Sequence, residues 1–275
     1  MSEAKGMIIN MKIVVPIKQV PETSNVKMNP ETGTMVREGV ESIINPLDLY
    51  AIETAIRLKE KFGGQVIVIS MGPDKALEAI KEAIAMGCDD GILLSDRKFA
   101  GSDTWATSYV IANGIKQIGD FDLVICGERA TDGDTAQVGP GIASFLDLPL
   151  STFTSEILSL NDGKIKVRRL VEGGYEEIEL ELPAALTVVK EISDPRLPTL
   201  RGKLKAKKME IPVWGPQNIN ADEENLGLKG SPTRVVKIFT PKVTREGEKI
   251  IVKDEKTLNE AVDKIMDYLI KKEFI

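Results

Sequence analysis

Four short apolar runs constrain this chain's fold more than any other feature. Each is followed, directly or after a loop, by a stretch with helical spacing. The runs are Lys12–Val15, Gln65–Ser70, Gly91–Leu94 and Leu123–Cys126. Strands that alternate with helices favour βαβ units, in which helices cover both faces of a parallel sheet. The sequence therefore predicts an α/β fold built on a mostly parallel sheet.

Capping residues and prolines mark where the helices should start. We expect helices at about 45–61, 75–86 and 104–118, and a fourth starting near residue 135. Asn45 is a suitable N-cap, followed by Pro46 at the first helical position, and Ser102-Asp103 can cap the third helix. The fourth helix should be capped by the Thr135 hydroxyl or the Asp134 carboxylate, with a proline in its early turns.

After Pro149 the pattern changes to alternating residues and tight turns. Residues 150–181, with turns at 161–163 and 173–174, predict an antiparallel hairpin addition to the sheet, and Pro183–Val189 predicts one more buried strand. The prolines and the turn at 30–33 likewise predict a hairpin that projects between the first strand and Asn45.

The C-terminal part has a different composition. From Lys190 the chain is rich in proline and lysine and shows little periodicity to about Lys242, which indicates an extended arm. Glu255–Ile270 then forms an amphipathic pattern, and this helix either covers the core or clasps another subunit. We therefore expect a binding domain at 1–190 and an arm with a helix at 191–275.

Composition excludes several function classes. The chain has no histidine, which removes Ser-His-Asp and Cys-His catalysis and every histidine metal motif. The net charge of −6 argues against nucleic-acid binding, and no apolar run is long enough to span a membrane. Two cysteines, Cys88 and Cys126, near predicted strands favour buried thiols in the reducing cytoplasm.

The carboxyl ends of the predicted strands should line one crevice, where ligands of such sheets bind. The loop after Cys126 feeds a helix N-terminus, whose free N–H groups and dipole make a seat for an anion. The dinucleotide pattern GxGxxG and the Walker pattern are both absent. A nucleotide would therefore have to use the 127–138 loop, where Thr135, Gln137 and Val138 offer donors, while Asn45 could read an adenine edge.

Two carboxylates in this loop leave a second interpretation open. Asp132 and Asp134 would repel a phosphate unless they face ribose hydroxyls, cap the helix or bind a cation, so the loop could be a capped structural turn. A calcium loop is weaker still, because later EF-hand ligands are missing. Asp103, Thr104 and Thr107 are either a cap and helix surface or ligand contacts.

A lysine-rich run at 203–208 also has two interpretations. Such runs are usually solvated, but a proline-bounded loop ending in Leu200 beside this patch could dock an acidic partner.

A series of motifs in order resembles the electron transfer flavoprotein beta subunit over nearly the whole chain. The motifs are VPIKQVPE, NPLDLYAIETAIRLKE, ISMGP, ALEAIKEAIAMGCDD, GSDTWATS, DLVICGERATDGDTAQVGPGIASFLDLP, LPAALTVV and PRLPTLRGKLKAKK. The resemblance implies a Rossmann-like domain, close to the adenine nucleotide alpha hydrolase fold, and an extended C-terminal arm that embraces an alpha subunit.

The resemblance also implies an adenine nucleotide in the crevice. The cofactor-binding residues carried over or placed beside it are Pro16, Asn45, Asp48, Met71, Asp103, Thr104, Thr107, Cys126, Gly127, Arg129, Asp132, Gly133, Asp134, Thr135, Gln137 and Val138. The loop Pro195–Lys208 resembles the family's recognition loop for a partner dehydrogenase or quinone oxidoreductase, with Leu200 as its anchor.

Two cofactors are compatible with this resemblance. The string at 132–140 resembles the electron-bifurcating type, in which the beta subunit holds FAD, takes a hydride from NADH and delivers electrons to the alpha-subunit FAD and to ferredoxin or flavodoxin. The alternative is a subunit that holds AMP structurally while the alpha subunit carries the only FAD. A nucleotide-sensing protein that acts alone is a third hypothesis, and it predicts a stable monomer.

Overall fold

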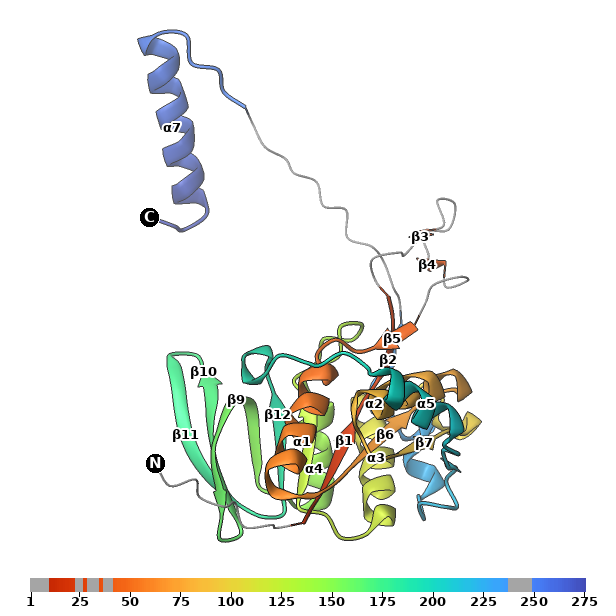
Figure 1. The fold of residues 1–275 in the computed structure, drawn as a ribbon. Coiled ribbons are helices and arrows are strands. Elements are labelled where there is room, and N and C mark those ends of the chain that lie inside the picture. The colour runs from red at the N-terminus through yellow and green to blue at the C-terminus, as the bar shows by residue number, and fades with distance from the viewer. Residues whose placement is uncertain (1–9, 23–26, 29–34, 37–41, 237–248) are drawn as a thin grey trace, which may run out of the picture. The chain divides into compact units, whose positions relative to one another are not determined.

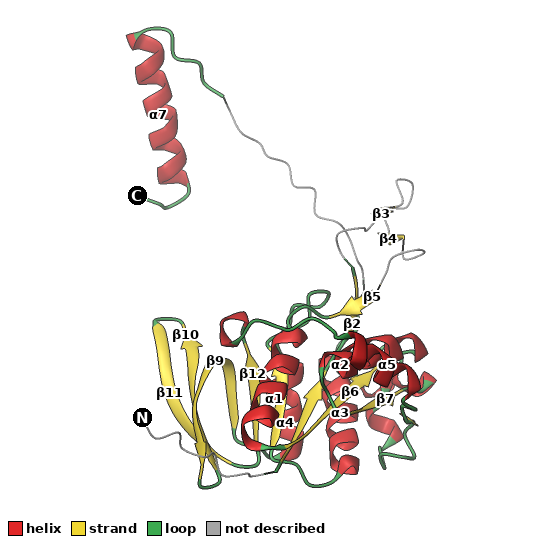
Figure 2. Cartoon of the chain, viewed as in Figure 1, coloured by secondary structure: helices red, strands yellow, loops and turns green. Residues whose placement is uncertain are grey.

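The computed structural model describes residues 10–22, 27–28, 35–36, 42–236 and 249–275 (Figure 1). The chain divides into two compact units, Met1–Val236 and Lys237–Ile275. The first unit contains the sheet and most of the helices. Figure 2 shows helices packed against the strands in this unit.

A nine-stranded sheet in the order β11-β10-β9-β12-β8-β1-β6-β7-β13 forms the centre of the first unit. Its parallel strands are β1 (Met11–Pro16), β6 (Gly64–Met71), β7 (Asp90–Leu94), β8 (Leu123–Gly127), β12 (Ala184–Val188) and β13 (Val213–Trp214). Each predicted apolar run is one of these strands. The α/β class and the mostly parallel sheet are therefore confirmed.

The antiparallel addition is also confirmed. It consists of β9 (Leu150–Asn161), β10 (Lys164–Val171) and β11 (Gly174–Glu181), joined by turns at the predicted places. Asp162 and Gly163 adopt left-handed backbone angles with φ of 51° and 74°, which suit a two-residue hairpin turn.

Four helices cover the two faces of the sheet. They are α1 (Asp48–Phe62), α2 (Leu77–Met86, after a 3₁₀ turn at Asp74–Ala76), α3 (Thr104–Ile118) and α4 (Val138–Leu146). The first two pack in one apolar cluster with residues such as Ile56 and Ile80, and the other two in a second cluster with Val110 and Ile142. The two clusters explain why the strands are apolar on both faces.

The expected projection after β1 is present in its described part. β2 (Gln19–Pro21) pairs with β5 (Ser42–Ile44), and β3 (Lys27–Met28) pairs with β4 (Met35–Val36), both antiparallel. The predicted turn at 30–33 lies outside the described residues.

Residues 191–236 differ from the extended arm that composition predicts. They form α5 (Leu200–Lys208), which packs on α2, then strand β13 and α6 (Gly227–Gly230). β13 extends the sheet beside β7, and the first unit accordingly continues to Val236. Burial of small residues such as Ala206 fixes α5, and small residues give only a weak hydrophobic pattern in the sequence.

The second unit contains the expected terminal helix, α7 (Glu255–Lys271). A capping box between Asp254 and Thr257 starts it. Its apolar residues Leu258, Val262 and Ile265 are exposed within the described chain. No helix among the described residues is long and apolar enough to cross a membrane.

Candidate functional site

The sheet changes direction between β1 and β8. From β1 the chain moves outward through β6 to β7, and then returns through α3 to β8 on the other side of β1. The helices that follow these two adjacent strands, α1 and α4, belong to clusters on opposite faces. Such a switch point leaves a crevice at the carboxyl ends of the strands, here at Pro16 and Gly127.

The start of α1 packs directly against the end of β8. A Cβ atom on Gly127 would lie 2.4 Å from Asp48 Oδ1 and 2.9 Å from the Leu47 carbonyl oxygen. Any larger residue would push α1 away from the strand. Glycine at this position therefore brings the start of α1 to the loop that follows β8.

Asn45 does not cap α1, contrary to the expectation. The helix begins at Asp48, and its N-cap residue Leu47 provides no side-chain cap. The Asn45 Nδ2 instead donates to Asp48 Oδ1 and to the Arg129 carbonyl oxygen, each at 2.9 Å, and Asn45 Oδ1 accepts from Thr131 N at 3.1 Å. Asn45 is fully buried. Its side chain therefore fixes the loop after β8.

Asp48, the first residue of α1, has a buried carboxylate that contacts Asn45. It accepts hydrogen bonds from Lys18 N at 2.8 Å and from Asn45 Nδ2. Burial raises the pKa of Asp48 to about 7, although the bonds from Lys18 and Asn45 act in the opposite direction. Its charge therefore changes near neutral pH.

The three acidic side chains of the loop are all paired with cations, and Arg129 Nε, 3.3 Å from Glu128 Oε1, serves two of them. Lys18 Nζ lies 2.7 Å from Asp132 Oδ1, and Arg129 Nε lies 3.1 Å from Asp134 Oδ1. These pairs reduce the repulsion that two free carboxylates would exert on a phosphate. The sequence analysis did not single out Lys18, because its partner lies 114 residues away.

Helix α4 begins at Val138, three residues later than expected. Its N-cap residue is Gln137, which forms no side-chain cap, so neither Thr135 nor Asp134 caps this helix. Asp134 and Ala136 adopt left-handed angles with φ of 55° and 54°. The backbone N–H groups of 135–139 donate no hydrogen bond to any described residue. N–H groups of this kind at a helix start are suited to bind an anion, and the anion seat stays a prediction.

The outer part of the loop leaves space for a ligand. A Cβ on Gly133 would have no described atom within 4 Å. Beyond it, Thr104 Oγ1 donates to Gln137 Oε1 at 3.1 Å, which joins the start of α3 to the loop. The site therefore has an open side at Gly133 and a polar wall at Thr104.

Asp103 is directed elsewhere. Its Oδ1 accepts from Ala106 N at 3.0 Å, as the predicted helix cap, and its Oδ2 accepts from the backbone and hydroxyl of Thr233 at 2.9 and 2.8 Å. Burial raises the pKa of this carboxyl, but these bonds together hold it below its usual range. Asp103 thus tethers the last part of the first unit to α3.

The predicted cofactor residues therefore fall into three groups. Hydrogen bonds join Asn45 to Asp48 and to the Arg129 carbonyl, and Lys18 links Asp48 to Asp132. A separate bond joins Thr104 to Gln137. The others lie at the ends of β1, β6 and β8, in the loop or at helix starts; they are Pro16, Met71, Asp103, Thr107, Cys126, Gly127, Gly133, Asp134, Thr135 and Val138. Leu200, the predicted partner-binding residue, is the first residue of α5.

The segment before α5 is held by an arginine that sequence reasoning missed. Arg196 donates through its backbone N, Nε and Nη2 to Glu53 at 3.1, 2.8 and 3.1 Å, and through Nη1 and Nη2 to Glu60 at 2.6 and 2.9 Å. Arg57 Nε also donates to Glu53 at 2.6 Å. Glu53 is only 2% exposed. This network, the Arg196 clamp, fixes Arg196 on α1, and Arg57 Nη2 also donates to the Asp194 carbonyl oxygen at 3.2 Å.

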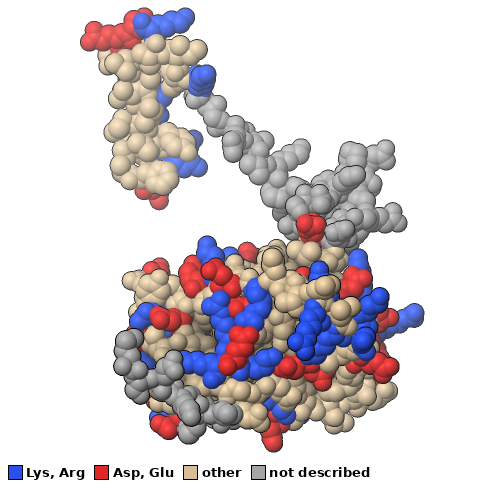
Figure 3. All heavy atoms as spheres, viewed as in Figure 1, with Lys and Arg blue, Asp and Glu red and all other residues tan. Residues whose placement is uncertain are grey.

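Apolar side chains next to the Arg196 clamp face solvent in the described structure. Leu197 is 84% exposed and Leu200, the first residue of α5, is 77% exposed. Lysine and arginine side chains gather on the surface over this part of the molecule (Figure 3). A fixed segment with exposed leucines among cations is suited to protein binding.

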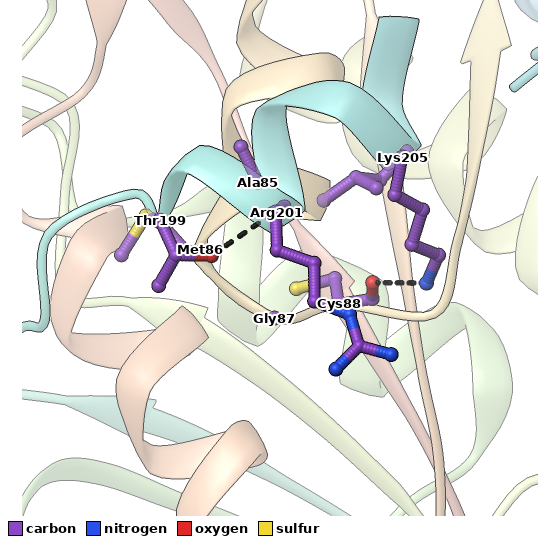
Figure 4. Close-up of a pocket in the computed structure, with 9 residues that line it drawn as sticks. Ala85, Met86, Gly87, Cys88, Thr199, Arg201 and Lys205 are labelled. Carbon is purple, nitrogen blue, oxygen red and sulfur yellow. Dashed lines mark hydrogen bonds between the residues drawn. The ribbon is translucent and has the colours of Figure 1, made fainter. Parts of the chain in front are cut away.

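A pocket of about 470 Å³ lies between the C-terminal end of α2, with the residues that lead into β7, and α5 (Figure 4). Thr199 N donates to the Ala85 carbonyl oxygen at 3.1 Å, and Lys205 Nζ donates to the Cys88 carbonyl oxygen at 3.2 Å. Burial raises the pKa of the Cys88 thiol to about 12, so this cysteine is not a nucleophile. The pocket lies at the packing interface between α5 and the sheet domain.

Comparison with known proteins gives a consistent result. A family model described as "Electron transfer flavoprotein domain" matches residues 32–218. The electron transfer flavoprotein subunit beta of Thermoanaerobacterium thermosaccharolyticum is 48% identical over 239 residues, which cover 86% of this chain and 91% of that protein.

Two further relatives have names that refer to other systems. CarD, a subunit of the caffeyl-CoA reductase-Etf complex of Acetobacterium woodii, is 46% identical over 266 residues, or 96% of this chain and 100% of that protein. Protein FixA of Azotobacter vinelandii is 44% identical over 260 residues, or 91% of this chain and 92% of that protein. The similarity in each case extends over nearly the full length.

Proposed function

The chain belongs to the electron transfer flavoprotein family as a beta subunit, and from this premise we propose that its crevice binds FAD for electron bifurcation. The beta subunit takes part in electron transfer and pairs with an alpha subunit. Residues of the 127–138 loop would hold the FAD, whose chemistry would supply two-electron acceptance from NADH and one-electron transfer to the alpha-subunit FAD and to a low-potential acceptor such as ferredoxin or flavodoxin.

The residues of the crevice fit a nucleotide. The free N–H groups of 135–139 and the positive end of α4 suit its phosphates. Thr135 and Gln137 have exposed polar side chains that can bond ribose or ribityl hydroxyls. Asn45, which is buried and fully engaged, would act by holding the 129–131 backbone in place. The strand ends at Pro16, Met71 and Cys126 would contact the adenine.

The absence of neighbouring atoms around Gly133 is the observation on which we propose FAD over AMP. AMP needs room only for its adenosine and one phosphate, whereas FAD continues beyond the phosphates into a ribityl chain and a ring system. A Cβ on Gly133 would have no described atom within 4 Å, so this position would not obstruct such an extension. Thr104 and Thr107 lie at the start of α3, which the Thr104–Gln137 contact joins to the loop. The similarity to CarD, whose name places it in a reductase complex, supports this choice.

The AMP alternative predicts a different cofactor content. If AMP fills the crevice as a structural ligand, the alpha subunit carries the only FAD. Purified alpha-beta heterodimer should therefore release two FAD under our proposal and one FAD plus one AMP under the alternative. A nucleotide sensor that acts alone predicts instead a stable, monomeric beta chain.

We also propose two protein-binding surfaces. The exposed leucines of the Pro195–Lys208 segment would bind a partner dehydrogenase or quinone oxidoreductase, with Leu200 as the anchor. The exposed apolar face of α7 would pack on the alpha subunit. The buried, unpaired thiols of Cys88 and Cys126 support a reducing compartment such as the cytoplasm for this carrier.

A further inference from the structure

The acidic loop after β8 is an unusual place for an anionic ligand. It contains Asp132 and Asp134 within a few residues of the free N–H groups at 135–139. A carboxylate close to a phosphate weakens its binding unless a cation compensates the charge. The residues that pair with these carboxylates therefore affect the affinity of any nucleotide in the crevice.

Asp134 is paired by a residue of its own loop, but Asp132 is paired from elsewhere in the chain. Arg129 Nε approaches Asp134 Oδ1 within the same loop, at 3.1 Å. Lys18, by contrast, reaches Asp132 across the mouth of the crevice from the segment that follows β1, at 2.7 Å. The pair joins the two strand ends that define the switch point.

Lys18 is held in position on both sides of its backbone. Its N–H donates to the buried Asp48 Oδ2 at 2.8 Å, and its carbonyl oxygen accepts from Asn45 N at 2.8 Å. Asn45 in turn holds the Arg129 carbonyl and the Thr131 N–H of the acidic loop. The Lys18 ammonium is therefore brought to Asp132 by the same buried contacts that fix the loop.

The Lys18–Asp132 pair contributes little to folding. The two side chains are 48% and 33% exposed, and exposed ion pairs typically add at most about 1 kcal/mol to stability. The effect of the pair on a bound phosphate is different, because the carboxylate and the phosphate repel each other whenever both are charged. Loss of the Lys18–Asp132 pair should therefore change nucleotide affinity more than the free energy of unfolding.

We propose that Lys18 is a positioning residue that shields the nucleotide phosphates from Asp132. The inference rests on the proposed nucleotide site, and it holds equally for FAD and for AMP because both carry phosphate. Lys18 acts through Asp132, so removing the Asp132 charge should make Lys18 dispensable.

The test is a double-mutant cycle on the alpha-beta heterodimer after its beta-site nucleotide has been removed. Affinity for FAD and for AMP is measured by titration calorimetry for wild type, Lys18→Met, Asp132→Asn and the double variant. We expect Lys18→Met to weaken binding roughly fivefold to tenfold, and the double variant to bind as tightly as Asp132→Asn alone. The weakening should shrink at high salt, which a purely structural loss would not do.

Two controls keep the outcome clear. Lys18→Arg keeps the charge and should bind like wild type, and Lys164→Met removes an equally exposed lysine, 47% against 48%, from an ion pair in the β10–β11 hairpin. Unchanged affinity in Lys18→Met, or a double variant as weak as Lys18→Met, overturns the proposal. If the wild type itself takes up neither FAD nor AMP, the proposed nucleotide site fails instead.

Discussion

Replacing Arg196 with alanine tests whether the Arg196 clamp fixes the segment that leads into α5. The change removes every side-chain hydrogen bond from Arg196 to Glu53 and Glu60, and leaves the buried Glu53 with Arg57 as its cationic partner. Removing one partner of a buried ion pair typically costs about 3–5 kcal/mol. Because Arg57 remains and Arg196 is 32% exposed, we expect a loss of about 2–3 kcal/mol.

Thermal unfolding and amide hydrogen exchange measure this loss. A loss of that size should lower the midpoint of the first unit by roughly 5–10 °C and raise exchange at 194–199. Burial raises the pKa of Glu53, but the bonds from Arg196 and Arg57 lower it below its ordinary value of 4.5. The clamp therefore stabilises above that pH, and the difference between variant and wild type should narrow as pH falls through the lowered pKa.

Arg201→Ala is the matched control for the Arg196 clamp. It removes an exposed guanidinium on α5 that forms no ion pair within the described residues. Arg196→Lys keeps the charge but cannot form the two-pronged contact, so it should lie between wild type and alanine. Equal stability of Arg196→Ala and Arg201→Ala would refute the role given to the clamp.

Two further predictions concern the crevice. Gly133→Asp adds charge and bulk where the structure has free space, so it should lower beta-site FAD occupancy without lowering the unfolding midpoint. The control Gly173→Asp, in equally free space in the β10–β11 turn, should leave FAD occupancy unchanged. Equal FAD retention in the two variants would contradict the prediction. The pKa of Asp48 is raised to about 7, so between about pH 4 and 7 the folded state binds a proton that the unfolded state has lost, and the free energy of unfolding should fall as pH rises through this range. Asp48→Asn should remove this dependence on pH. A variant with the same pH dependence as wild type would contradict the raised pKa of Asp48.

The strands and helices of the sheet domain could be predicted from sequence because their patterns are local. The four apolar runs and the Asp103 cap depend only on neighbours in the chain, and the structure places them as expected. Residues 200–208 were harder, since α5 packs through small residues such as Ala206 and its charged side chains hide the helical pattern.

The contacts of the candidate site depend on long-range partners, and this is where local reasoning was wrong. Asn45 matches the pattern of an N-cap, but bonds to Arg129 and Thr131, more than eighty residues away, take its side chain instead. Thr135 also matches a cap, yet the left-handed angles at Asp134 and Ala136 delay the helix to Val138. At Asn45, tertiary hydrogen bonds outweighed the local capping preference. At Thr135, the backbone conformation did so.

Native mass spectrometry of the purified alpha-beta heterodimer tests the central claim most directly, because it reports every cofactor bound to one complex. Our account predicts a complex that carries two FAD molecules and no AMP, and a Gly133→Asp complex that has lost one of them. A wild-type complex that carries one FAD and one AMP would contradict the account and would assign the crevice to a structural nucleotide.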